Sequence, residues 1–142
     1  MEKYFANYNQ SLALKGLVFD MPCFRYIYIG DTGNNVDRYE ETEPSRAINY
    51  NHDSLCISQP LKSQVFEWFR EKHNLLNEIS FYRCDRRTKK SYWFTIFKWD
   101  DSMVNREIIR DKNDTYYSTY DDAESACIHK LIELVKNGRK IN

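Results

Sequence analysis

The end of the chain carries the pattern that most restricts the fold. From Tyr120 to Gly138, apolar residues recur at the three- and four-residue spacing of an amphipathic helix. Thr119 with Asp122 resembles a capping box with Asp in place of Glu, and Asn137-Gly138 is typical of a helix end. The expected inward stripe consists of Ala123, Cys127, Leu131, Leu134 and Val135. A helix with one apolar face must bury that face against a second element, so this pattern predicts a globular domain.

A second helix is predicted from Leu61 to Leu76, opened by Pro60 and ending at His73-Asn74. Its expected apolar stripe consists of Leu61, Val65, Trp68, Phe69 and Leu76, with Phe66 widening it. Trp68 and Leu131 lie at the centres of the two stripes. We therefore expect both side chains to be core anchors.

A short first helix is predicted from Asn9 to Lys15. Asn7 or Asn9 can cap its start, and Gly16 offers a left-handed stop at its end. Its expected inward residues are Leu12, Ala13 and Leu17.

The strands are predicted from β-branched and aromatic runs between turn residues. Cys23 to Ile29 is apolar or aromatic on both faces, which favours a central strand, and a second strand follows around Val36 to Glu40. A hairpin is predicted from the two runs Glu78 to Cys84 and Ser91 to Trp99. A second hairpin is predicted from Val104 to Arg110 and Thr115 to Ser118. The polar segment 41–54 is either a long loop or holds a short edge strand.

The resulting element order is α-β-β-α-β-β-β-β-α. This order predicts an α+β fold, with a single antiparallel sheet and the helices packed on one face. The 142 residues show no linker and no internal repeat, so we expect residues 1–142 to form a single globular domain.

Composition excludes several classes of protein. Formal net charge is zero, whereas proteins that bind nucleic-acid phosphates are usually basic. No apolar leader or membrane-length run is present, so we expect a cytoplasmic protein without a membrane partner. The four cysteines are widely spaced and the histidines are not clustered, so we expect reduced thiols, no metal site and no cofactor.

Three segments resemble small uncharacterised proteins encoded by phages and integrated elements of gut bacteria. Leu14 to Phe24 resembles the opening of those proteins, Pro60 to Lys72 their central "FxWFREK" helix, and Tyr120 to Lys136 their C-terminal helix. Gly16 replaces a usual Glu, and Asp121-Asp122 a usual Glu pair. The resemblance implies an origin on a mobile element; it implies no activity and no site residues.

The strongest candidate site is a basic turn beside aromatic residues. Its members are Arg83, Arg86, Arg87, Lys89 and Lys90, followed by Trp93 and Trp99. Cationic groups next to exposed rings can hold phosphates and stack bases. A face shared by Trp93, Trp99 and Arg86 would favour nucleic acid, whereas exposed aromatics that lie elsewhere, beside neutral surface, would favour a protein partner.

Signs of catalysis are few. Tyr28 to Thr32, with Gly16 to Val18 upstream, is spaced like the halves of a GIY-YIG nuclease, and Arg38 is its candidate arginine. No helix or metal-binding Glu follows at the expected place, so this reading ranks third. We expect a non-enzymatic phage or mobile-element accessory protein that binds a host or phage protein. The alternative is a nucleic-acid-binding module that uses the turn Arg83–Lys90.

Overall fold

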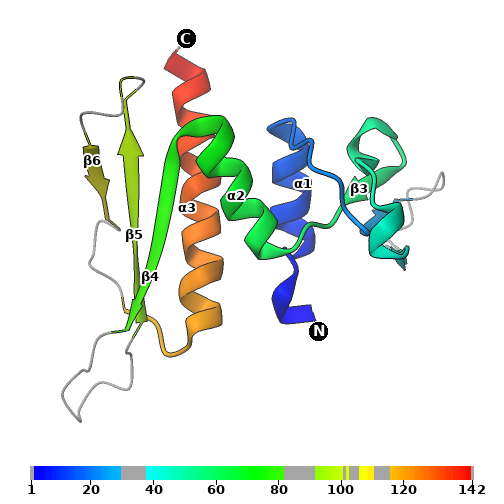
Figure 1. The fold of residues 1–142 in the computed structure, drawn as a ribbon, viewed down its shortest axis with the longest axis horizontal. Helices are drawn as coiled ribbons and strands as arrows, with labels where there is room; N and C mark the ends of the chain where they lie inside the picture. The colour runs from blue at the N-terminus through cyan, green and yellow to red at the C-terminus, as the bar shows by residue number, and fades with distance from the viewer. Residues whose placement is uncertain are drawn as a thin grey trace. The chain divides into compact units, whose positions relative to one another are not determined.

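A computed structural model describes residues 2–29, 38–81, 92–100, 102, 106–110 and 116–141, and shows an α+β fold (Figure 1). The α-helices are α1 (Tyr8–Gly16), α2 (Lys62–His73) and α3 (Tyr120–Ile141). The strands are β1 (Arg25–Tyr28), β2 (Arg38–Glu41), β3 (Cys56–Ser58), β4 (Leu75–Phe81), β5 (Tyr92–Trp99) and β6 (Arg106–Ile109). Short 3-10 helices are η1 (Glu2–Tyr4), η2 (Pro44–Arg46) and η3 (Tyr50–His52).

The strands form two separate three-stranded antiparallel sheets, so the prediction of a single sheet is wrong. Their orders are β2-β1-β3 and β4-β5-β6. The chain divides into two compact units, Met1–Val65 and Phe66–Asn142, with one sheet in each. The reason lies in β3, which pairs with β1 and completes the first sheet. With three residues, β3 is too short to show a strand period in the sequence.

The first sheet confirms β1 as a central strand. Ile27 is fully buried and lies opposite Tyr39 of β2 on one side and Ile57 of β3 on the other. The polar segment 41–54 contains η2 and η3, and its Ile48 forms an isolated bridge with Cys23. Most of this segment is therefore ordered turns rather than strand.

Helix α1 begins with the capping that the sequence predicts, but its buried face differs. The Gln10 backbone N–H donates to Asn7 Oδ1 at 2.8 Å, and the Asn7 N–H donates to Gln10 Oε1 at 2.9 Å. Leu12, expected to face inward, is 45% exposed, whereas Gln10, Ser11 and Leu14 are buried. The predicted inward face is wrong because the buried Gln10 side chain has a hydrogen-bond partner in the cap. A polar residue at this position therefore does not indicate the exposed face of the helix.

Helix α1 also ends differently from the prediction. Gly16 is helical, and the left-handed residue is Val18, with φ of 66°. The Phe19 N–H donates to the Leu14 carbonyl, and the Val18 N–H to the Lys15 carbonyl, both at 3.0 Å. This is the hydrogen-bond pattern of a Schellman motif, with a β-branched residue at the position that glycine usually takes.

Replacing Val18 by glycine is expected to raise the free energy of unfolding by about 0.5–1.5 kcal/mol, since glycine tolerates this backbone without strain. The Val18 side chain is 70% exposed, so little packing is lost. Urea unfolding followed by far-UV circular dichroism measures the change. A Val18→Ala variant, which keeps a Cβ at this φ, is the control and should gain less. A loss of stability in Val18→Gly would show that the side chain matters more than the backbone strain.

In the second unit, the predicted hairpin of β4 and β5 is confirmed, with Leu76 opposite Phe97 and Ser80 opposite Trp93. Strand β6 pairs with the other edge of β5. Of the predicted strand Thr115 to Ser118, the described part contributes an isolated bridge from Tyr117 to Tyr92. Leu76 lies in β4 and not in α2, because Asn74 takes a left-handed φ of 55° and ends the helix.

Helix α3 lies along one face of β4 and β5 (Figure 1). Its N-terminus is capped as predicted, since the Asp122 N–H donates to Thr119 Oγ1 at 3.1 Å. Ala123, Cys127, Leu131 and Val135 are buried, and so are Ile128 and Ile132. The predicted stop at Gly138 is wrong, because α3 continues to Ile141.

Candidate functional site on the second sheet

The face of the second sheet opposite α3 gathers the aromatic residues of β5. Because side chains alternate along a strand and paired residues share a face, register assigns each residue to a side. Leu75, Lys98, Glu107 and Ile109 line one cavity with Leu134 and Val135 of α3, so they mark the helix side. The opposite side, called the aromatic face here, consists of Leu76, Glu78, Ser80, Trp93, Thr95, Phe97, Trp99, Arg106 and Ile108, with Arg110 following.

Two arginines lie against the rings of this face. The Arg106 Cζ is 4.9 Å from the Phe97 ring centroid, and the Arg110 Cζ is 5.4 Å from the Trp93 centroid. Both distances are typical of cation–π pairs. These contacts confirm that Arg106 and Arg110 project to the same side of the sheet as the rings.

The surface is open enough to contact a partner. Ile108 is 47% exposed, Arg106 and Arg110 are exposed, and the three rings are half-buried. Thr95 is buried between its neighbours on the face. Within the described residues, neither arginine forms an ion pair, so both guanidinium groups keep donors for a ligand.

The predicted nucleic-acid site stays a prediction. Trp93 and Trp99 lie on one face, as alternation along β5 requires. Arg83, Arg86, Arg87, Lys89 and Lys90 lie outside the described residues. Sequence reasoning missed Phe97, Arg106 and Arg110. The even spacing of Trp93 and Phe97 in the sequence could have indicated that both lie on one side of a strand. The two arginines lie on this face because β6 pairs with β5, which the sequence does not show.

A cavity of about 360 Å³ lies on the helix side of the same sheet. Its lining includes His73 and the directly opposed pair Lys98 and Glu107. The opposite charges of this pair give the cavity no clear preference for a charged ligand.

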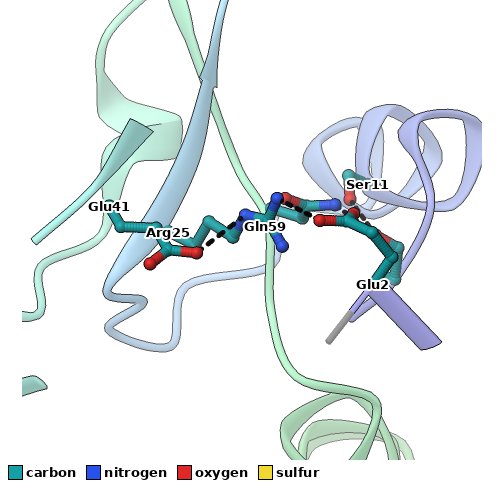
Figure 2. A network of polar contacts seen from close by, with 6 residues as sticks. Glu2, Ser11, Arg25, Glu41 and Gln59 are labelled. Carbon is teal, nitrogen blue, oxygen red and sulfur yellow. Dashed lines mark hydrogen bonds and ion pairs between the residues drawn. The ribbon is translucent and has the colours of Figure 1, made fainter. Parts of the chain in front are cut away.

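A second polar cluster lies in the first unit (Figure 2). Arg25 is buried; its Nη2 lies 2.6 Å from Glu2 Oε1, and its Nε lies 3.5 Å from Glu41 Oε1. The guanidinium also contacts the Phe5 ring, with Cζ 4.6 Å from the centroid. Arg25 therefore joins η1, β1 and β2, which is a structural role.

The GIY-YIG reading finds no support in its upstream half. Gly16 ends α1 and Val18 lies in the turn after it, whereas the nuclease motif needs a strand there. Gly30 to Thr32 lie outside the described residues, and Arg38 begins β2. Among the described residues, no group of three or more His, Cys, Asp or Glu is placed to hold a metal ion.

The described thiols are buried and poorly ionised. Burial raises the pKa of Cys23 to about 12, against a hydrogen bond from Ser58 that lowers it. Burial also raises the pKa of Cys127, and the Glu124 carboxylate adds to the shift. Because the thiolate is the nucleophile, both thiols are inert near neutral pH.

This shift predicts a pH dependence of stability. The folded state holds the Cys127 proton more tightly than the unfolded state, so the contribution is complete below the ordinary pKa of 9.0 and is lost as pH rises above it. Above that pH, the free energy of unfolding should fall by about 1 kcal/mol per pH unit more in the wild type than in Cys127→Ala. Urea titrations followed by tryptophan fluorescence report this for Phe66–Asn142, which holds all three tryptophans. Equal slopes would contradict the burial of an ionisable thiol.

Comparison with protein-family models, with curated proteins and with solved structures finds no match to this chain. None of the described helices is both long enough and apolar enough to span a bilayer.

Proposed function

We propose that the protein acts without catalysis, by binding a protein of the host or of the phage in the bacterial cytoplasm. The observation that supports this is the aromatic face, where Trp93, Phe97 and Trp99 share one side of a sheet with Arg106 and Arg110. Tryptophan and arginine are the residues most enriched at the energetic centres of protein interfaces. The resemblance of three segments to mobile-element proteins supports the cellular setting.

Charge also favours a protein partner over nucleic acid. The described part of the aromatic face holds two arginines and one glutamate among seven uncharged residues, and formal net charge of the chain is zero. A nucleic-acid site usually needs several cations along a backbone track. An apolar centre flanked by a few charges is the usual anatomy of a protein interface.

The proposal is tested by affinity capture of partner proteins from infected host cells. The wild type is compared with a variant in which one exposed residue of the aromatic face is changed. Ile108→Glu places a charge at the edge of the aromatic face, where the side chain is 47% exposed. Leu12→Glu is the matched control, because Leu12 is 45% exposed on α1. We expect one captured protein to be retained by the wild type and by Leu12→Glu, and lost by Ile108→Glu. Equal retention by a folded Ile108→Glu protein would contradict the assignment of the aromatic face.

Nucleic-acid binding is the second candidate, and the sharing of one face by Trp93 and Trp99 favours it. Under the leading proposal, wild-type affinity for DNA or RNA should be weak and sequence-blind, with Kd of about 10⁻⁴–10⁻⁶ M near physiological salt. An anisotropy titration measures it, with the variant that changes Arg86, Arg87, Lys89 and Lys90 to Ser as comparison. Nanomolar binding that disappears in this variant would reverse the ranking of the two candidates.

A further inference from the structure

We propose that the partner presents an extended peptide segment that adds as a strand beside β6 and carries two acidic side chains, which pair with Arg106 and Arg110. This inference rests on the proposed function and specifies the ligand of the same face. In the described part of the sheet, β6 is an edge strand with β5 as its one strand partner. An exposed edge offers unpaired backbone groups to an added strand.

The spacing of side chains along this edge defines the ligand. Arg106, Ile108 and Arg110 alternate along the chain and lie on the aromatic face, as the contacts with Phe97 and Trp93 show. Two residues four positions apart in a strand are separated by about 13 Å. Residues directly opposite each other on paired strands share a face. A bound strand would therefore place acidic residues opposite the two arginines and an apolar residue opposite Ile108.

The arginines are available for carboxylates. Each guanidinium lies over a ring, and neither forms an ion pair within the described residues. The donors of arginine's planar fork match a carboxylate in bidentate geometry, and each exposed guanidinium can turn from its ring on β5 toward an acidic side chain beside β6. A nucleic-acid backbone carries a charge at every nucleotide, whereas this edge places an exposed isoleucine between its two cations. The sparse charge fits an acidic peptide better.

Selection from a displayed library of random nine-residue peptides on the immobilised full chain tests this proposal. Enriched peptides should share an acid–x–apolar–x–acid pattern. Their affinity should fall at least about tenfold for the Arg106→Ser/Arg110→Ser variant, because charge-assisted hydrogen bonds are lost. The control is Lys72→Ser/Lys136→Ser, which removes two exposed lysines of α2 and α3 and should leave affinity unchanged. The reversal Arg106→Glu/Arg110→Glu should select basic peptides instead.

Hydrogen exchange distinguishes strand addition from other modes of binding. Every second amide proton of Arg106–Ile109, those that point away from β5, should gain protection when a selected peptide is bound. A selection that yields no acidic pattern, or a bound peptide that leaves these amides unprotected, overturns the inference. Tighter binding of a labelled oligo-dT than of any selected peptide, lost in Arg106→Ser/Arg110→Ser, overturns it in favour of nucleic acid. If protein capture still depends on Ile108 when the peptide selection fails, the proposed function stands and this inference alone fails.

Discussion

Replacing Trp68 by alanine is expected to lower the free energy of unfolding by about 3–5 kcal/mol, and Leu131→Ala to have a similar effect. Trp68 is 3% exposed and Leu131 is fully buried, so the sequence prediction that both lie in the core is confirmed. The Trp68 ring makes edge contacts with Phe69 and His73, with centroids 5.1 and 4.8 Å apart. Alanine would remove these contacts and leave a cavity that close-packed surroundings fill only in part.

Urea unfolding followed by tryptophan fluorescence measures these costs, since Trp93 and Trp99 remain as probes. Arg70→Ala is the matched control for Trp68→Ala, because Arg70 lies on the same helix and is exposed. We expect it to change stability by less than about 0.5 kcal/mol. Losses below about 1 kcal/mol for both core variants would mean that the buried faces are wrongly assigned.

The double variant Glu2→Gln/Glu41→Gln is expected to lower the free energy of unfolding by about 2–3 kcal/mol, because it leaves the buried Arg25 guanidinium without a counter-charge. Among the residues that the structure describes, Arg25 Nη1 and the neighbouring Gln59 Oε1 have no hydrogen-bond partner, so the surroundings offer little compensation (Figure 2). This loss of stability is smaller than the loss on breaking a fully buried ion pair, because Glu2 is 73% exposed and Glu41 49% exposed.

Adding Arg25→Met to this double variant should restore most of the lost stability, since methionine keeps much of the apolar packing and removes the uncompensated charge. Far-UV circular dichroism is the appropriate probe, because Met1–Val65 contains no tryptophan. Glu43→Gln, at an exposed position outside this cluster, serves as the control for loss of one carboxylate. No recovery in the triple variant would show that the arginine contributes through packing or hydrogen bonds rather than through charge.

Local patterns in the sequence were sufficient for the elements whose stability is decided locally. Helix α3 and its Thr119 cap follow from spacing and cap chemistry, and the β4–β5 hairpin follows from two β-prone runs around a turn. Helix ends were less certain. Gly16 and Gly138 read as stops, yet both are helical. In α1 the left-handed position falls on Val18 instead, where hydrogen bonds to Leu14 and Lys15 hold it.

The candidate site was predictable only in part. Trp93 and Trp99 were singled out from the sequence, and alternation alone places them on one side of β5. Their neighbour Arg106 belongs to β6, and Arg110 directly follows that strand. The sequence of β5 does not indicate that β6 pairs with it. The nuclease, nucleic-acid and protein-binding hypotheses all remain predictions about function. The expectation of one domain for residues 1–142 also remains a prediction.

The sequence by itself determined where the three α-helices and most of the strands lie, because hydrophobic period and cap residues act within a few positions of the chain, but it did not indicate β3. Only the tertiary structure decided how the strands are divided between two sheets. Pairing of β1 with the three-residue β3 depends on residues about 30 positions apart, and its free energy comes from burial of Ile27 and Ile57 against each other. That long-range pairing completes one sheet in Met1–Val65 and leaves β4, β5 and β6 to form another, whose face opposite α3 carries the rings and arginines.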